Sequence, residues 1–354
     1  MKTVSVCVLA YNEEKFLPGV LRDIEMQTYP ADYIEVVLID SGSLDRTRNL
    51  MENFCKKNKD RFLNIQVIDN PGRIQSCGWN EAIIHFTSDV MIRVDAHSHI
   101  PPEFVQKNME NLAQGELVSG GIRPTLTEGE DAFSRTLLLA ENSMFGSSVS
   151  TARRGGNKTY VKSFFHGAYD RKVLETVGGF REDLGRTEDN EFHYRIRQHG
   201  YQLAMSPDIV SYQYIRPTLW KMGKQKFGNG YWIGLTAGVC PGCLSVYHFV
   251  PFAFVGGILL TTILSILGYP LLGIIMWSMY GVLAVAMALL AVAGETKKHG
   301  VMILLPLMFL YLHVLYGVGT WIGLLRMPFW RKKHKECPSV ERVKENMLHE
   351  SDLS

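Results

Sequence analysis

The N-terminal part of the chain alternates short apolar runs with amphipathic segments. The run at residues 4–10 is apolar and rich in β-branched side chains, which is typical of a buried parallel strand. Similar runs predict strands at 34–39, 65–68 and 90–94, and helical spacing of apolar residues predicts helices at 16–24, 44–54 and 76–86. Because strands and helices that alternate in this way form right-handed βαβ crossovers on a parallel sheet, the predicted fold class is α/β.

The alternation becomes less regular after Pro101. Residues 133–145 show helical spacing, residues 160–165 are strand-like, and residues 189–199 form a strongly amphipathic helical segment that stops at Gly200. Short strands at 201–204 and 209–214 would complete the soluble domain, to which we assign residues 1–230.

The last third of the chain contains long apolar segments. Residues 246–294 contain no Asp, Glu, Lys or Arg. Since one membrane span takes about 20 apolar residues, this stretch predicts two spans, at 246–268 and 270–294, and residues 301–325 form a third apolar segment. We therefore assign residues 231–330 to a membrane region and expect the tail at 331–354, which starts with basic residues, to be a solvated extension.

The charges that flank the apolar segments leave two topologies open. No signal peptide precedes Val4, so we expect the soluble domain to stay in the cytosol. Two spans would then return Lys297 and Lys298 to the cytosol, as the positive-inside rule requires, but a third span would place the basic run at 331–335 outside. The third segment, which contains Pro306 and several glycines, is therefore either a span or a re-entrant or interfacial segment.

Composition excludes several classes of protein. Of 354 residues, 46% are hydrophobic and 20% are charged, which excludes a disordered, collagen-like or disulfide-rich chain. Lys and Arg (37) nearly balance Asp and Glu (35), so the net charge of +2 gives no reason to expect nucleic acid as a partner. Only Cys240 and Cys243 have CxxC spacing, and we expect reduced thiols without zinc. No glycine-rich dinucleotide or Walker motif occurs.

Acidic residues follow two of the predicted strands. Asp40 ends the second strand, and the loop after it, which includes Ser43 and Asp45, can be a simple turn and helix cap or a place where a ligand base or ribose is bound. Asp95 ends the fourth strand, with His97 two residues later. This carboxylate and imidazole can form an ordinary turn, or they can converge on a divalent cation that bridges diphosphate oxygens.

A third acidic group begins the amphipathic helix at 189–199. Glu188 and Asp189 can serve as N-terminal caps, which the helix dipole favours. The alternative is that one carboxylate accepts a proton from a hydroxyl group in a cleft. Each acidic group is ambiguous alone, and the combination is more informative.

The combined motifs resemble those of family 2 inverting glycosyltransferases of the GT-A fold, a Rossmann-like fold that binds nucleotide-diphospho-sugars. The resemblance covers about residues 3 to 230. It rests on Ala10-Tyr11-Asn12-Glu13-Glu14, Leu38 to Thr47, Asn70-Pro71-Gly72-Arg73, Arg93-Val94-Asp95-Ala96-His97, Val177-Gly178-Gly179-Phe180 and Glu188-Asp189-Xaa-Glu191-Phe192. The Asp-Ala-His variant and the membrane tail are most similar to succinoglycan-type bacterial polysaccharide glucosyltransferases.

The resemblance implies roles for individual residues. Asp189 would be the catalytic base, and the nucleotide-sugar would be bound by Ala10, Tyr11, Glu13, Asp40, Arg73 and Asp95. Asp95 and His97 would hold Mg²⁺ or Mn²⁺, although many relatives carry an aspartate where this chain has His97. On the acceptor side we expect His166, Gly167, Glu188 and Arg216. The Gln-Xaa-Xaa-Arg-Trp signature of processive synthases is absent, which favours addition of one sugar per acceptor.

The expected function is a membrane-anchored, metal-dependent, inverting hexosyltransferase of cell-surface polysaccharide biosynthesis. By resemblance the donor is UDP-glucose and the location is the bacterial inner membrane, with the catalytic domain in the cytosol. The acceptor would be a saccharide on an undecaprenyl-pyrophosphate-type lipid, whose pyrophosphate Lys221, Lys224 and Lys226 could bind unless they only anchor the domain. Two alternatives are a polyprenyl-phosphate glycosyltransferase, which needs no base, and an inactive membrane-anchored scaffold.

Overall fold

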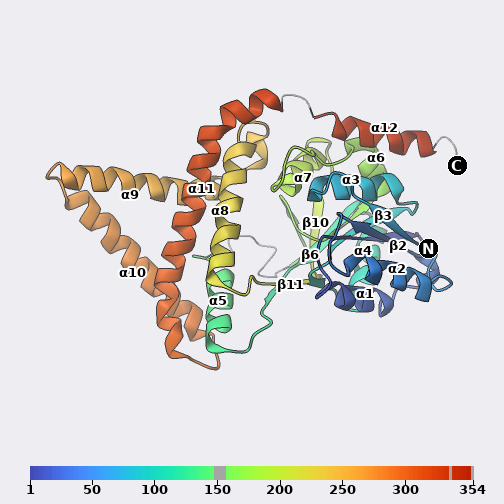
Figure 1. The fold of residues 1–354 in the computed structure, drawn as a ribbon, viewed down its shortest axis with the longest axis horizontal. Coiled ribbons are helices and arrows are strands. Elements are labelled where there is room, and N and C mark those ends of the chain that lie inside the picture. The colour runs from blue at the N-terminus through green and yellow to red at the C-terminus, as the bar shows by residue number, and fades with distance from the viewer. Residues whose placement is uncertain (147–156, 335–336, 352–354) are drawn as a thin grey trace. The chain divides into compact units, whose positions relative to one another are not determined.

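The computed structural model describes residues 1–146, 157–334 and 337–351. They form two compact units (Figure 1). The first unit comprises residues 1–124, 154–213 and 336–354, and the second comprises 125–153 and 214–335. The division differs from the predicted one, since residues 125–153 and the whole of helix α8 (Leu219–Thr236) belong to the second unit.

The first unit is built on a mixed sheet with strand order β3-β2-β1-β4-β9-β6-β10-β8. The strands are β1 (Val4–Ala10), β2 (Ile34–Asp40), β3 (Asn64–Asp69), β4 (Val90–Asp95), β6 (Val118–Ile122), β8 (Thr159–Val161), β9 (Gly167–Asp170) and β10 (Leu203–Val210). β1 pairs in parallel with β2 and β4, and β2 pairs in parallel with β3, as the sequence predicted. β9 pairs antiparallel with β4 and β6. The short strand β11 (Tyr212–Tyr214) pairs with β5 (Ser98–His99).

Alternating side chains of the strands form two separate cores. Val4, Val6 and Val8 of β1 face a core that contains apolar residues of α1 (Leu17–Glu25), α2 (Thr47–Lys57) and α4 (Phe104–Ala113). Cys7 faces the opposite core, which contains residues of α3 (Gln75–His85), α6 (Arg171–Val177), α7 (Glu188–Gln198) and α12 (Ser339–Ser351). Both faces of the sheet are therefore covered by helices, which explains why its central strands are mostly apolar.

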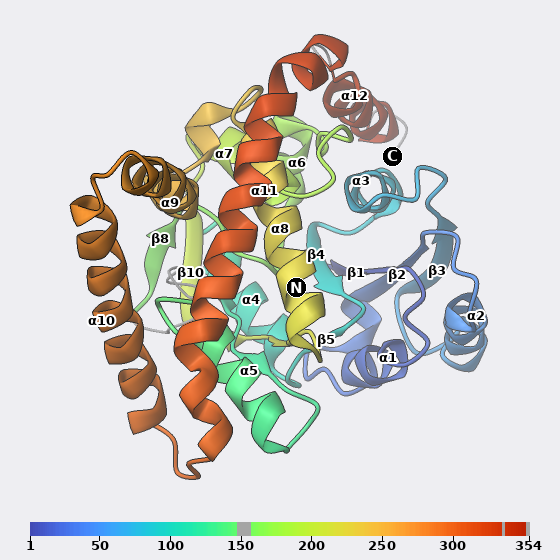
Figure 2. The ribbon, with the colours of Figure 1, turned by 60° about the vertical axis from the view of Figure 1, so that its left-hand side comes forward.

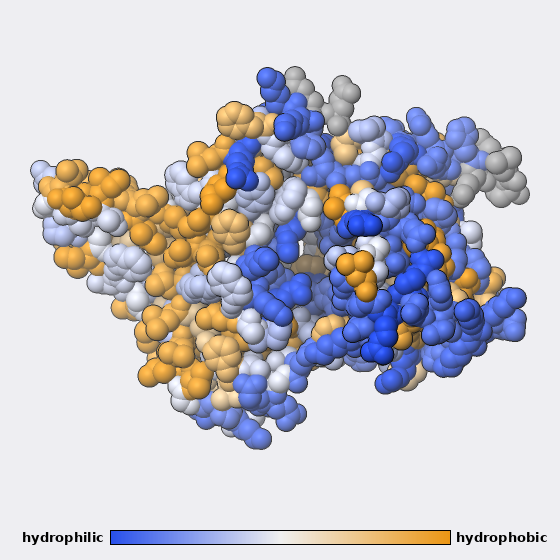
Figure 3. Space-filling view, in the orientation of Figure 1, coloured by the Kyte–Doolittle hydropathy of each residue, from blue (hydrophilic) through white to orange (hydrophobic). Residues whose placement is uncertain are grey.

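The second unit is a group of helices. It contains α5 (Ala132–Asn142), α8, α9 (Val250–Ile266), α10 (Leu271–Ala293) and α11 (Leu305–Lys333), with β7 (Thr125–Leu126) and the short 3₁₀ turns η3 (Pro241–Cys243), η4 (Val246–Phe249) and η5 (Gly300–Leu304). Segments Val246–Ile266, Leu271–Ala293 and Gly300–Lys333 are long and apolar enough to cross a membrane. α9 and α10 form a hairpin whose apolar side chains are mostly exposed, and Figure 3 shows a hydrophobic surface over them.

Some predicted elements differ from the observed ones. The strand expected at 160–165 is only β8, and β9 follows it unpredicted. The strands expected at 201–204 and 209–214 are instead the longer β10 and the short β11. The elements α4, β6, α6 and α8 were not predicted from the sequence. The expectation of a solvated tail was wrong, because Val343 and Met347 of α12 are buried in the core of the first unit.

Candidate active site

The candidate site lies where β1, β2 and β4 end. β1 is the middle strand of the three, and its register places Ala10 beside Asp40 of β2 and Leu9 beside Asp95 of β4. Asp40 and Asp95 are therefore about two strand spacings, roughly 10 Å, apart. The carboxyl ends of parallel strands are the usual ligand sites of open α/β sheets.

Hydrogen bonds join the loops after β1 and β2. The Ser43 amide donates to Oδ1 of the buried Asp40 (3.2 Å), the Asn12 amide donates to Oγ of Ser43 (3.0 Å), and the Leu44 amide donates to Oδ1 of Asn12 (2.8 Å). The Arg73 side chain lies against Gly42 in the same loop. Four of the residues predicted to bind the nucleotide, Ala10, Tyr11, Asp40 and Arg73, are thus brought together, and Tyr11 is exposed.

Asp95 is held by two cationic or polar side chains. Nε2 of His166 lies 3.2 Å from Oδ2 of Asp95, and Nη1 of Arg123 lies 3.9 Å from the same oxygen. Burial opposes ionisation of Asp95, but its hydrogen bond with His166 and the charges around it hold its pKa well below the usual range. Burial lowers the pKa of His166, whose Nδ1 lies 2.9 Å from Oγ of Ser211. The site therefore presents Asp95 as an oriented anion.

His97 also has partners on both of its ring nitrogens. Nδ1 lies 3.2 Å from Oε1 of Glu13, and Nε2 lies 3.4 Å from Nε2 of Gln213. Glu13 is in turn fixed by its amide, which donates to Oγ1 of Thr47 (2.8 Å). The loop after β1 and the loop after β4 therefore meet through the Glu13–His97 contact.

Asp189 is linked to the same strand as Asp95. Nη1 of Arg93, two residues before Asp95 on β4, donates to Oδ1 of Asp189 (2.7 Å). The Asp189 side chain keeps 23% of its surface exposed. Its neighbour Glu188 is buried, and burial together with the charge of Asp189 raises the pKa of Glu188 to about 8. The start of α7 thus combines a protonated carboxyl group at neutral pH with a partly exposed carboxylate.

Backbone strain is concentrated in the loops of the site. Among the described residues, three non-glycine residues have a positive φ: Asn12 (54°), Arg73 (57°) and Thr187 (72°). They lie after β1, after β3 and immediately before α7. A β-branched residue such as Thr187 rarely adopts this conformation, and such strain is often found at functional sites.

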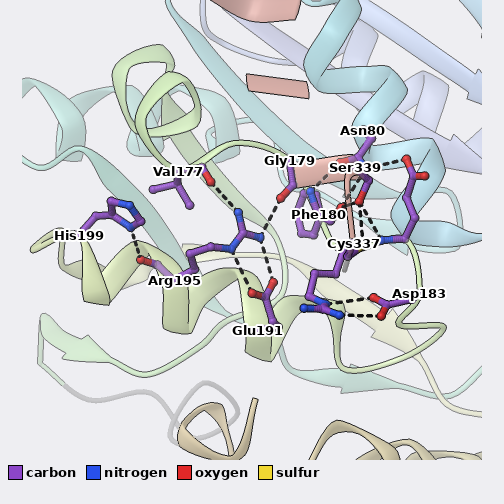
Figure 4. A network of polar contacts seen from close by, with 12 residues as sticks. Asn80, Val177, Gly179, Phe180, Asp183, Glu191, Arg195, His199, Cys337 and Ser339 are labelled. Carbon is purple, nitrogen blue, oxygen red and sulfur yellow. Dashed lines mark hydrogen bonds and ion pairs between the residues drawn. The ribbon is translucent and has the colours of Figure 1, made fainter. Parts of the chain in front are cut away.

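The segment at 177–183, which leads into α7, is clamped by three helices (Figure 4). Arg195 of α7 donates to the carbonyl oxygens of Val177 (2.6 Å) and Gly179 (2.7 Å). Asn80 of α3 donates to the Phe180 carbonyl (2.9 Å) and accepts from its amide (2.6 Å), and Ser339 of α12 donates to the same carbonyl (2.9 Å). The position of Phe180 is therefore fixed by side chains from three different elements.

The structure gives the positions of the residues that were predicted for the acceptor side. His166 and Glu188 lie with Asp95 and Asp189, whereas Gly167 is packed tightly against Phe164 and its smallness is explained by that packing alone. Arg216 is exposed and belongs to the second unit, so its role stays a prediction. Of the three lysines on α8, Lys226 is buried against Glu141 (2.9 Å), so it is not available to an acceptor, while Lys221 and Lys224 are exposed.

Sequence reasoning gave no role to Arg93 or Arg123. Arg93 stands inside a strand of otherwise apolar residues, and Arg123 is buried with its guanidinium against the Phe165 ring. Because arginine is almost never fully buried without a partner, the charge inside the run 90–94 was the signal that could have identified Arg93.

Sequence comparison shows a match between the N-terminal half of the chain and a known family. Residues 5–178 match the model of glycosyl transferase family 2. A dolichyl N-acetyl-α-D-glucosaminyl phosphate 3-β-D-2,3-diacetamido-2,3-dideoxy-β-D-glucuronosyltransferase from Methanococcus voltae is 27% identical over 333 residues, which cover 92% of this chain and 98% of that protein. Succinoglycan biosynthesis protein ExoA from Rhizobium meliloti is 27% identical over 228 residues, covering 64% of this chain and 67% of that protein.

Comparison with solved structures gives the same kind of fold that the sequence predicted. The structure of the mannosyltransferase PcManGT from Pyrobaculum calidifontis in complex with GDP-Man and Mn²⁺ superimposes with a TM-score of 0.56 at 20% identity, covering 92% of this chain and 87% of that one. At this identity the similarity shows the fold, which is GT-A-like.

Proposed function

The chain carries a family 2 glycosyltransferase domain with a GT-A-like fold, and from this premise we propose that it transfers one sugar from an NDP-sugar to a hydroxyl group of a lipid-linked saccharide, with inversion. The observation that carries the proposal is the Arg93–Asp189 hydrogen bond (2.7 Å), which brings a partly exposed carboxylate from a distant helix to the strand that ends at Asp95. A base and a diphosphate-binding carboxylate at one sheet edge are what this reaction requires.

Each side chain of the site would have a separate role in the reaction. Ala10, Tyr11 and Asp40 would bind the nucleoside, with Arg73 beside it. Asp189 would accept the proton of the acceptor hydroxyl as its oxygen bonds to the anomeric carbon and the bond to the diphosphate breaks. A single displacement of this kind inverts the anomeric centre. His166 and Arg123 would keep Asp95 oriented throughout.

A divalent cation fits the end of β4 if the nucleotide supplies part of its coordination. No group of three or more His, Cys, Asp or Glu side chains in the described part of the chain could hold an ion unaided. Mg²⁺ sites, however, commonly use one or two carboxylates plus substrate phosphates. Asp95 and His97 would hold the ion here, and it would neutralise charge on the departing diphosphate. Imidazole suits Mn²⁺ at least as well as Mg²⁺.

The lipid-linked acceptor is supported by the apolar helices and by a relative. The Methanococcus voltae protein is named for transfer to the 3-position of a sugar on dolichyl phosphate, and the present chain covers 98% of its length. We infer a similar kind of acceptor here, a sugar hydroxyl on a polyprenyl phosphate or pyrophosphate. UDP-glucose is the donor that the resemblance to succinoglycan-type enzymes favours, and the inner membrane of a bacterium is the corresponding location.

The decisive assay incubates the full-length protein with individual NDP-sugars, Mg²⁺ or Mn²⁺, and membranes that contain endogenous lipid acceptors. We expect one NDP-sugar to give a lipid-extractable labelled product with the inverted anomeric configuration. A product in which the sugar is attached directly to polyprenyl phosphate would instead support the polyprenyl-phosphate transferase. If no NDP is released with any donor, the inactive scaffold is supported.

The membrane topology can also be inferred, starting from α12. Ser339 is bonded to the Phe180 carbonyl, Arg342 lies 2.5 Å from Glu182, and Val343 and Met347 are buried in the core of the first unit. A helix that is folded into this core lies on the same side of the membrane as the rest of the unit. The chain between Thr218 and Pro338 must therefore cross the membrane an even number of times.

The packing of helices in the second unit supports a choice between the segments that could cross. α8 and α11 run in the same direction, with Gly223 near Tyr311 at one end and Gly238 near Met327 at the other. They pack through two GxxxG segments, Gly230-Tyr-Trp-Ile-Gly234 and Gly319-Thr-Trp-Ile-Gly323. A Cβ on Gly230 would overlap the Tyr316 carbonyl oxygen, and one on Gly323 would overlap that of Tyr231. The two helices therefore lie at the same depth.

These two constraints favour one arrangement. If α11 were one of an even number of crossings it would begin on the far side, and so would α8 beside it, but α8 begins at Leu219, soon after the first unit ends at Gln213. We infer that α9 and α10 cross as a hairpin while α8 and α11 lie along the membrane surface. In Figure 1 α9 runs sideways away from α11 within the second unit, and in Figure 2 it is seen nearly end-on beside α11. Lys297 and Arg331 then face the same side, in agreement with the positive-inside rule.

Epitope tags test this topology. One tag is placed at the C-terminus and another after Lys297 of the full-length chain, and protease sensitivity is measured in right-side-out and inside-out vesicles. We expect both tags to be digested in the same vesicles as the N-terminal domain. Protection of the C-terminal tag alone would mean that α11 crosses.

A further inference from the structure

We propose that Arg93 is a positioning residue that orients Asp189 for proton transfer. The inference rests on the proposed function, in which Asp189 is the base. Arg93 itself is 2% exposed and lies behind the carboxylate, so it has no surface to offer to a substrate. It would act entirely through Asp189.

The hydrogen bond leaves one oxygen of the base available. Arg93 donates to Oδ1 of Asp189, and among the described residues Oδ2 has no hydrogen-bond partner. A guanidinium group is always charged and has a rigid planar geometry, so it fixes both the charge and the orientation of a carboxylate partner. Oδ2 is then the oxygen that would receive the proton of the acceptor.

Two aromatic rings fix the guanidinium. Its central carbon lies 4.4 Å from the centre of the Trp79 ring and 4.7 Å from that of the Phe180 ring, and both rings are buried. Contacts of this kind hold a cation over the ring faces. Phe180 is the residue that Asn80 and Ser339 bind at its backbone, with Arg195 bonded to the residue before it (Figure 4). A continuous set of contacts thus leads from three helices to the carboxylate of Asp189.

The arrangement is not the one that stability alone would favour. Nε of Arg93 is buried and has no hydrogen-bond partner among the described residues. A buried polar group left unpaired lowers the stability of the folded state. An arginine whose task was only to stabilise the core would be expected to satisfy this group, as Arg171 does by donating through Nε to the Ser88 carbonyl (3.0 Å) and through Nη2 to the Phe86 carbonyl (2.9 Å).

A double-mutant cycle tests the proposal in the full-length protein. Arg93→Met should lower kcat by about 100-fold, the cost of a misplaced catalytic group, with little change in KM for the donor. In the Asp189→Asn background the same substitution should cause little further loss, because the two residues act as one unit. Arg93→Lys, which keeps the charge but not the planar geometry, should recover part of kcat. Arg171→Met, which removes a half-buried arginine stacked on Phe86, is the matched control and should leave kcat per folded molecule unchanged.

The outcomes separate this proposal from the proposed function. If the Arg93→Met and Asp189→Asn losses multiply, or if Arg93→Met raises KM instead of lowering kcat, Arg93 does not position the base. If Asp189→Asn alone keeps near-normal turnover, the role of Asp189 in the proposed function fails. Thermal melting of each variant identifies losses due to unfolding, and if Arg93→Met does not fold, a kcat for Arg93→Lys equal to wild type would overturn the proposal.

Discussion

The two units each contain an ion pair with a buried cation, and the pairs differ in how far the carboxylate is exposed. In the first unit the Arg93 side chain is 3% exposed and that of Asp189 is 23% exposed. In the second unit the side chains of Lys226 and Glu141 are 9% and 10% exposed, and their charged atoms are 2.9 Å apart between α8 and α5. The first pair has a partly open carboxylate at the edge of the sheet, while both partners of the second are enclosed. We propose that the first pair serves chemistry and that the second holds helices together.

The largest effect is expected at the open pair. Asp189→Asn should lower kcat by about 10²–10⁴, the usual value of a general base, and should leave the melting temperature nearly unchanged because the amide can still accept from Arg93. NDP release and donor affinity, measured on the same preparation, would check both parts. A large loss of thermal stability would make this pair structural, like the second one.

The enclosed pair should respond in the opposite way. Lys226→Met removes the cation that is paired with the buried Glu141 and should cost about 3–5 kcal/mol of unfolding free energy, while kcat per folded molecule stays the same. Denaturation in detergent measures the stability. Lys224→Met, an exposed lysine on the same helix, is the control and should behave as wild type. Loss of kcat in a folded Lys226→Met protein would contradict a purely structural role for the second pair.

Glu188 should make the first unit sensitive to pH. An acid whose folded pKa is about 8 retains a proton that the unfolded chain releases at its ordinary pKa near 4.5, so stability falls as pH rises between these values. Glu188→Gln cannot titrate, and its melting temperature relative to wild type should therefore rise from about pH 5 to about pH 9. Melting curves across this range, with Glu103→Gln as an exposed control, test the expectation. A constant difference would mean that Glu188 is ionised in the folded protein.

The smallest effect concerns the nucleotide end of the site. Asp40 ends β2 and is buried beside Ala10, whereas Asp69 ends the neighbouring strand β3 and its side chain is 80% exposed. Asp40→Asn should weaken NDP-sugar binding by about tenfold, equivalent to one lost hydrogen bond of about 1.4 kcal/mol, and Asp69→Asn should have no effect. Calorimetric titration with an NDP-sugar distinguishes them, and equal affinities for the two variants would remove Asp40 from the binding site.

The sequence predicted the sheet edge well because its signals are local. The strands that end at Asp40 and Asp95 are short apolar runs stopped by a carboxylate, and β1 matches its predicted bounds. β9 was missed because Gly167-Ala-Tyr-Asp170 is too short and too mixed in polarity to show a strand pattern, and its place between β4 and β6 depends on distant pairing. The helix α12 was misjudged because its few apolar residues are buried by contact with distant parts of the chain, including α3 and α6.

The side chains that contact the acidic residues could not be predicted from the sequence around those residues. Nothing in the sequence near Asp189 indicates Arg93, which is 96 residues away, and nothing near Phe180 indicates Ser339. The resemblance to a family identified the acidic residues, and only the folded chain shows which bases and cations they meet. The same holds for α8, whose glycines became meaningful once the matching segment of α11 was seen beside it.

We propose that Asp189 accepts the proton of the acceptor hydroxyl, while Asp95 lies at the diphosphate that leaves the same anomeric carbon. A structure of the full-length Asp189→Asn variant, soaked with intact NDP-sugar and Mn²⁺, tests it most directly, because the slow variant should preserve the donor. We predict that the diphosphate lies beside Asp95 and His97, with the anomeric carbon facing position 189. Density for the nucleotide at a place away from the ends of β1, β2 and β4 would contradict the account.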